Sequence, residues 1–76
     1  MSKFEGRKLK YVKLHSTSFV PGLGGLPDTL PPINKTFTEL TMVYEKDGVY
    51  INVVEKGKKY ETLIPWPNVQ MAVFEE

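Results

Sequence analysis

Apolar and polar residues alternate along the second half of the chain, between residues 38 and 74. Three apolar-rich runs, at residues 40–44, 49–54 and 60–64, are separated by charged segments that contain Gly48 and Gly57. Because successive side chains of a strand point to opposite faces, this pattern predicts three strands joined by tight turns. We expect an antiparallel meander in which Gly48 supplies the positive φ of the first turn. The predicted core face of the middle strand is Val49, Ile51 and Val53.

A proline-rich break follows the meander, at Pro65-Trp66-Pro67-Asn68. Two prolines within three residues remove two backbone donors, so a central strand cannot continue through this segment. A single 3₁₀ turn fits, because such turns are short and serve as connectors. The apolar run at residues 70–74 then predicts a last strand.

An earlier alternation lies at residues 8–14 and predicts the first strand of the chain. Leu9 and Tyr11 share one face of this strand, but the alternation then slips, and Val12 and Leu14 are the next apolar pair. A β-bulge at Tyr11-Val12 would turn both sets toward the core, and bulges are common where a strand bends.

Proline and glycine dominate residues 15–35, where four prolines and three glycines fall within 21 residues. Proline removes donors and glycine favours turns, so neither a helix nor a strand is expected to persist here. Six apolar residues argue against a solvated linker, namely Phe19, Val20, Leu23, Leu26, Leu30 and Ile33. We expect an ordered loop that lays some of these side chains over one end of the fold. A mobile loop is the alternative.

The order of these elements is a strand, a long loop, a three-stranded meander, a one-turn break and a final strand. This order resembles that of the SH3-like small barrels, in which the long first connection lies on the binding side. The resemblance covers residues 8–74 and implies an all-β fold, a small five-stranded antiparallel barrel. The acidic cluster and aromatic pair that peptide-binding SH3 domains use have no match in residues 15–35. The resemblance therefore does not imply polyproline binding.

Length and composition narrow the possible classes of protein. The 76 residues predict a single domain, residues 1–76, with a small core, and the polar residues 1–7 are expected to fray. Cysteine is absent and His15 is the only histidine, so we expect no disulfide, no metal site and no cofactor. We expect no contact with a membrane, because no apolar run in the sequence is long enough to form a membrane-spanning helix. A chain without cysteine fits the reducing cytoplasm, where we expect the protein to act.

Enzymatic activity is not expected from this set of residues. One histidine, no cysteine and scattered carboxylates leave few ways to pair a nucleophile with a base. Ser16, Thr17 and Ser18 follow His15, and we expect their hydroxyls to bond backbone groups at the end of the first strand. A small binding protein or regulator is the class that remains.

The apolar side chains of residues 15–35 favour protein–protein contact. So small a core cannot bury all of them, and the exposed ones would form an interface patch or a seam between two copies. The residues expected to bind protein are Phe19, Leu23, Leu26, Leu30 and Trp66. A domain of this size without catalytic groups would suit a phage or mobile-element regulator that binds a host protein.

Binding of RNA or DNA is the alternative function, although the formal net charge is only +1. Five basic residues lie within residues 1–13, where Glu5 is the only acid. Basic side chains on a strand can follow phosphates, and an exposed aromatic ring can stack on a base. The residues expected to bind nucleic acid are Arg7, Lys8, Lys10, Lys13 and Tyr50. Lysines on an edge strand equally guard against edge-to-edge aggregation.

Overall fold

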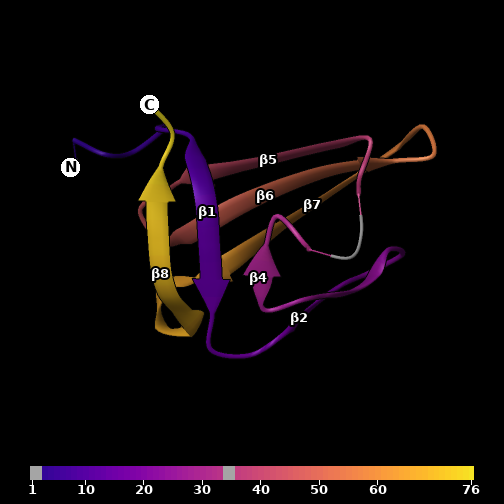
Figure 1. Ribbon diagram of the computed structural model, residues 1–76, viewed down its shortest axis with the longest axis horizontal. Helices are drawn as coiled ribbons and strands as arrows, with labels where there is room; N and C mark the ends of the chain where they lie inside the picture. Colours follow the sequence, from indigo (N-terminus) through magenta and orange to yellow (C-terminus); the bar gives the residue numbers. More distant parts are fainter. Residues whose placement is uncertain (1–2, 34–35) are drawn as a thin grey trace.

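The computed structural model of the protein describes residues 3–33 and 36–76, and its regular structure is β-strand with one short turn of helix (Figure 1). The strands are β1 (Leu9–Leu14), β2 (Ser18–Val20), β3 (Gly24–Leu26), β4 (Thr29–Leu30), β5 (Glu39–Tyr44), β6 (Gly48–Glu55), β7 (Lys58–Pro65) and β8 (Val69–Phe74). The 3₁₀ turn η1 (Trp66–Asn68) separates β7 from β8, where the proline-rich break predicted it. No α-helix occurs within the described ranges, so the fold is all-β.

The strands form three small antiparallel sheets with the orders β4–β1–β8, β2–β3 and β5–β6–β7. Figure 1 shows β1 and β8 side by side at one end of the long β5–β6–β7 meander. A one-residue bridge between Lys8 and Val43 links the chain just before β1 to β5. None of the three sheets closes on itself, so the five-stranded barrel expected from the sequence is not confirmed.

One hydrophobic core draws side chains from all three sheets. Its buried members are Leu9, Val12, Leu14, Val20, Leu26, Leu30, Phe37, Met42, Val49, Ile51, Val53 and Ile64. Partly buried apolar residues, among them Leu40, Tyr44 and Tyr60, pack against its margin. One face of β1 and one face of the meander therefore point into this core, and their other faces point away from it.

The β5–β6–β7 meander follows the predicted pattern. Val49, Ile51 and Val53 of β6 are at most 1% exposed, which confirms the predicted core face. Lys56 and Gly57 join β6 to β7 with φ values of 52° and 78°. Positive φ at both central residues defines a type I′ turn, whose twist matches that of the flanking strands.

Gly48 is required for a different reason from the one expected. It already belongs to β6, where it pairs with Pro65, and its φ is not positive. A Cβ atom at this position would collide with the backbone of Ile64 and Pro65 on β7. The prediction of a positive φ was wrong, and the close approach of the neighbouring strand is what selects glycine here.

β1 contains a bulge one residue earlier than predicted. Its register with β8 shifts between Leu9 and Tyr11, which leaves Lys10 as the extra residue. Leu9, Val12 and Leu14 are at most 3% exposed, as the slip in alternation predicts. Tyr11, which was expected in the core, stays partly exposed because the bulge turns it outward with Lys10.

Three short strands occupy residues 15–33, where no regular structure was expected. β2 and β3 form a hairpin, and β4 pairs with β1. The prolines do not interrupt these strands, because Pro21 and Pro27 fall between them and Pro31 follows β4. Gly22, with φ of 86°, lies in the turn of the hairpin and allows the chain to reverse there.

Most of the apolar side chains of this region are ordered against the core. Val20, Leu26 and Leu30 are at most 2% exposed. This burial agrees with the expectation of an ordered loop that lays apolar side chains over the core, for residues 15–33. Residues 34 and 35, which the prediction also covered, lie outside the described ranges.

Residues 3–7, which were expected to fray, pack against β5 and β8. The centroid of the Phe4 ring lies 5.8 Å from that of Tyr44 and 5.1 Å from that of Phe74. The Gly6 N–H donates a hydrogen bond of 2.8 Å to the Tyr44 carbonyl. Ring packing of this kind outweighs the polar character of the segment. Residues 1 and 2 belong to the same prediction but lie outside the described ranges.

Candidate protein-binding surface

Asn68 in η1 fixes the point where the chain leaves β1. Its Oδ1 accepts hydrogen bonds from the N–H and the hydroxyl of Ser16, both of 3.0 Å. Its Nδ2 donates to the Ser16 carbonyl at 3.2 Å, and its own carbonyl accepts from the His15 N–H at 2.8 Å. The Ser16 hydroxyl thus bonds a side chain rather than the backbone group expected. Together these bonds set the direction of the chain toward the β2–β3 hairpin.

The β2–β3 hairpin presents Phe19 to solvent. Val20 faces the core, so Phe19, the residue before it in β2, must point the other way. Phe19 pairs with Gly25, and paired residues of an antiparallel ladder place their side chains on the same face. Since Gly25 has no side chain to cover the ring, Phe19 is 70% exposed.

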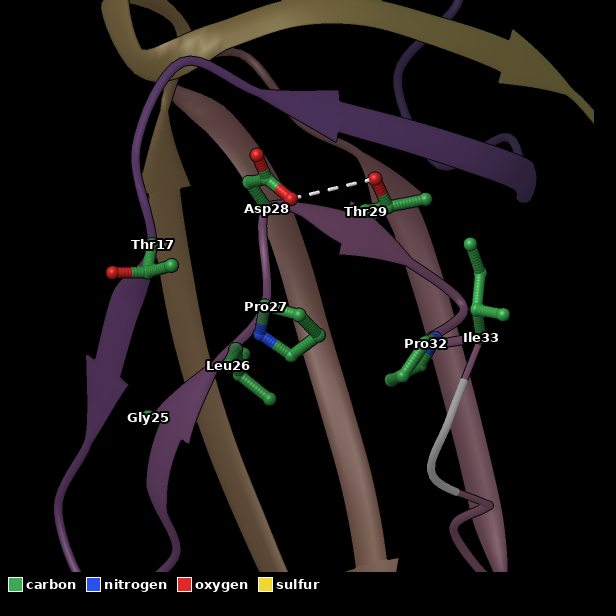
Figure 2. A pocket seen from close by; sticks show the side chains of 8 residues that line it. All are labelled: Thr17, Gly25, Leu26, Pro27, Asp28, Thr29, Pro32 and Ile33. Carbon is green, nitrogen blue, oxygen red and sulfur yellow. Dashed lines mark hydrogen bonds between the residues drawn. The ribbon is translucent and has the colours of Figure 1, made fainter.

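A mostly apolar hollow of about 550 Å³ adjoins the hairpin (Figure 2). It is lined by Thr17, Gly25, Leu26, Pro27, Asp28, Thr29, Pro32 and Ile33. Figure 2 shows Thr17 on one side of the hollow and Pro32 and Ile33 on the other, with Pro27 between them. Phe19 does not line the hollow itself, but it pairs across the hairpin with Gly25, which does. Phe19 and the lining residues are called the hairpin surface below.

The hollow has an apolar rim and a polar end. Ile33 at the rim is 86% exposed. At the other end the Asp28 carboxylate lies 3.6 Å from the Lys13 ammonium and 3.5 Å from the Thr29 hydroxyl, which donates to it. Because Lys13 balances the charge of Asp28, the hollow carries little net charge.

The residues predicted to bind protein occupy different environments. Phe19 is exposed, and Leu23 is half-buried near the tip of the hairpin. Leu26 and Leu30 are 1% and 0% exposed, so both belong to the core, although Leu26 also forms part of the wall of the hollow. The sequence offered no means of telling the inward from the outward side chains of so short a hairpin.

Trp66 lies apart from the hairpin surface. Its Nε1 donates to the carbonyls of Glu45 and Lys46 at 3.0 and 3.1 Å, and its ring centroid lies 4.5 Å from that of Tyr44. The tip of the hairpin instead packs on Tyr60, at the opposite end of β7. The structure therefore does not bring Trp66 and the loop residues into one patch.

Seven residues of the hairpin surface were not assigned to a site from the sequence, namely Thr17, Gly25, Pro27, Asp28, Thr29, Pro32 and Ile33. The density of proline and glycine in residues 15–35 was the available signal. That density marks an unusual segment, but the face that each residue occupies depends on the pairing of β2 with β3.

Two of the residues predicted to bind nucleic acid share a face. Lys8 bridges to Val43, Val43 pairs with Tyr50, and Tyr50 pairs with Leu63. Paired residues lie on one face, so these four form a row across the outer side of the meander. The outer side is the one opposite the core residues Val49 and Ile51.

The other three predicted nucleic-acid residues are spread over different parts of the surface. The Arg7 guanidinium lies 4.2 Å from the centroid of the Phe74 ring. Lys10 is exposed at the bulge of β1, and Lys13 pairs with Asp28 beside the hollow. Only Lys8 and Tyr50 are therefore brought together by the register of the strands.

A carboxylate adjoins Tyr50 on the outer side of the meander. Glu61 accepts hydrogen bonds from Lys59, whose Nζ lies 3.3 Å from Oε1, and from Tyr50, and these bonds lower the pKa of Glu61. Loss of water around the Tyr50 hydroxyl raises its pKa, and the hydrogen bond to Glu61 raises it further. A carboxylate at this place repels phosphate.

The described residues hold no cluster of three or more His, Cys, Asp or Glu side chains that could bind a metal ion. Across residues 3–33 and 36–76, no helix has the length and apolar character needed to cross a membrane. Comparison with family models, with curated proteins and with solved structures finds no match to this chain. The function proposed below therefore rests on the chemistry of the protein surface.

Proposed function

We propose that this protein is a non-enzymatic binding module that contacts another protein through the hairpin surface. The observation that carries the proposal is the 70% exposure of Phe19 beside a mostly apolar hollow. An exposed aromatic ring next to an apolar recess is typical of the centre of an interface, because binding removes both from water. Ile33, at the rim of the same hollow, extends the apolar area.

The partner we propose is a protein segment that inserts an apolar side chain into the hollow beside Phe19. Burial of one such side chain contributes about 1.5–3 kcal/mol, and covering the Phe19 ring adds a term of similar size. Asp28 is half-exposed and already paired with Lys13, so it adds little binding energy. Apolar contact is thus the main source of affinity at this surface.

Replacing Phe19 and Ile33 together by serine tests the proposal. Both side chains are exposed, so the double variant Phe19→Ser, Ile33→Ser is expected to unfold at nearly the same temperature as the parent. A photoreactive phenylalanine analogue at position 19 is expected to crosslink a specific protein in cells that produce this chain. The double variant is expected to lose that protein in affinity purification.

Leu63→Ser is the matched control, because Leu63 is 46% exposed on the outer side of the meander, away from the hairpin surface. The partner should remain bound to this variant. A partner that the double variant retains, or that Leu63→Ser loses equally, would contradict the proposal.

Binding of single-stranded RNA or DNA to the outer side of the meander is the second candidate function. It is supported by the shared face of Lys8 and Tyr50, where Lys8 would meet a phosphate and Tyr50 would stack on a base. Glu61 beside Tyr50 opposes it, which is why we rank it second. Lys8→Glu should abolish a mobility shift of labelled oligonucleotides at low salt, while Lys46→Glu in the β5–β6 turn should not. If the parent protein leaves the mobility of the labelled oligonucleotides unchanged at low salt, this candidate function is ruled out.

We further propose that the sheets are an open form of the SH3-like barrel and that the module acts in the cytoplasm. Pairing of β1 with β8, together with the Lys8–Val43 bridge to β5, supports the strand order β8–β1–β5–β6–β7. NMR contacts that extend the pairing of β1 with β5 beyond that bridge would test the barrel. The cytoplasmic location is supported by the absence of cysteine, which suits a reducing compartment.

A further inference from the structure

β8 is an edge strand with one open side. In the β4–β1–β8 sheet it pairs with β1, and no other strand of the described chain pairs with it. Figure 1 shows β8 as the outermost strand at its end of the molecule. The open side of such a strand presents backbone N–H and C=O groups to which a further strand can bond.

The hydrogen bonds to β1 determine which groups of β8 face the open side. The Glu75 N–H donates to the Lys8 carbonyl at 3.0 Å, so the backbone of Glu75 faces β1. Backbone direction alternates along an antiparallel strand. The N–H and C=O groups of Phe74 and Ala72 therefore point outward.

The edge strands β7 and β4 carry features that discourage pairing, whereas β8 has only an irregularity in its register with β1, at Gln70. The free edge strand β7 contains Lys58, Lys59, Glu61 and Pro65, and β4 is two residues long. Residues 69–74 contain neither a charged residue nor a proline. Charges, prolines and short length are the usual protection of edge strands. β8 has instead the composition of a strand that pairs on both sides.

β8 also carries apolar side chains on its outer face. Met71 pairs with Lys13 and Val73 with Tyr11, on the side opposite the core. Met71 is 48% exposed and Gln70 is also exposed, whereas the other four residues of β8 are half-buried. A neighbouring strand with an apolar outer face would cover the Met71 side chain.

We propose that β8 pairs with β8 of a second copy of this chain, antiparallel about a two-fold axis at Ala72. In this register Ala72 lies opposite the partner's Ala72, and both use their outward N–H and C=O groups. Met71 then lies opposite the partner's Val73 on the outer face. The two β4–β1–β8 sheets become one continuous sheet, and the open side of β8 is covered in both copies.

Charge favours the antiparallel direction. Glu75 and Glu76 follow β8, and antiparallel pairing places these carboxylates of the two copies at opposite ends of the interface. A parallel pair would bring four carboxylates together, where like charges repel. The interface uses β8 and does not involve the hairpin surface. The dimer and the proposed function can therefore be tested independently of each other.

Sedimentation equilibrium of the full chain over a range of concentrations tests the dimer. The mass is expected to rise from 8.7 kDa to twice that value as concentration increases. Met71→Lys is expected to weaken the dimer, because it removes the apolar contact with the partner's Val73 and places two positive charges near each other across the two-fold axis. Leu63→Lys is the matched control, since Leu63 is 46% exposed on the meander, and it should dimerise like the parent. A parent protein that stays monomeric at every concentration, or a dimer that Met71→Lys leaves intact, would overturn the proposal.

An NMR measurement on the unmodified protein checks the register directly. In a mixture of isotope-labelled and unlabelled chains, contacts between the Met71 methyl group and the partner's Val73 methyl groups are expected. Contacts that map to other strands would overturn this interface. A β8 that pairs only when an extended peptide from a different protein is added would likewise overturn the homodimer.

Discussion

Glycine is required at position 48 by a close contact with the neighbouring strand β7. The Ile64 and Pro65 backbone of β7 occupies the space where a Cβ of residue 48 would lie. Its neighbours in the turn, Lys46 and Asp47, are exposed. The strands can therefore approach closely only at a position without a side chain.

Gly48→Ala is expected to lower the free energy of unfolding by about 2–3 kcal/mol, because rigid backbone rather than a flexible side chain must move. Urea denaturation measures the loss. Gly25→Ala is the control, since its Cβ would lie 4.0 Å from the Ser18 carbonyl oxygen, an ordinary contact distance, and its φ is not positive. Equal losses in the two variants would show that close approach at Gly48 is unimportant.

The Tyr50–Glu61 pair gives a second prediction at this scale, a pH dependence. The pKa of Tyr50 is raised above its ordinary value of 10.0, so its contribution to stability is complete below about pH 10 and is lost as pH rises through the folded pKa. The pKa of Glu61 is lowered, so its contribution is present above its unfolded pKa and is lost as pH falls through the folded pKa.

Glu61→Gln is expected to lower the pKa of Tyr50, because the carboxylate that accepts its hydrogen bond and repels the phenolate is removed. NMR titration of the Tyr50 ring carbon that bears the hydroxyl measures the shift. Glu45→Gln serves as the control, since Glu45 lies at the β5–β6 turn and does not contribute to the Tyr50 shift. A Tyr50 pKa that stays the same in Glu61→Gln would contradict the assignment.

Individual elements differ in how far the sequence predicts them. The meander follows from alternation and from glycine in its turns, and the Lys56-Gly57 turn depends only on local backbone preference. β2, β3 and β4 could not be predicted in this way, because each has two or three residues and too little alternation to read. They persist because Val20, Leu26 and Leu30 are buried against the rest of the fold.

Asn68 joins two of these elements, and its removal should loosen the path from β1 to the hairpin. Asn68→Ala deletes the side-chain bonds to Ser16 and is expected to lower the free energy of unfolding by about 1–3 kcal/mol. Amide hydrogen exchange should also become faster at Ser16. Ser16→Ala removes the hydroxyl bond alone, so its loss should be smaller. A larger loss in Ser16→Ala than in Asn68→Ala would contradict this role.

On the scale of the whole molecule, the all-β class could be predicted and the arrangement of the sheets could not. Strand order depends on contacts such as the Lys8–Val43 bridge. The alternation of apolar and polar residues around Lys8 or around Val43 does not reveal such a contact. The candidate surface was likewise predicted only in part. Exposure of Phe19 was anticipated, but burial of Leu26 and Leu30 depends on where the hairpin docks.

Trp66 is the only tryptophan in the chain, and its position makes it an optical reporter of folding. Its indole is held by the Glu45 and Lys46 carbonyls, so loss of that turn should shift its emission to longer wavelength. The hairpin tip packs on Tyr60 at the other end of β7, so a ligand on the hairpin surface should leave the emission unchanged. Unfolding can therefore be followed by Trp66 fluorescence in the same sample in which binding is recorded by a second label.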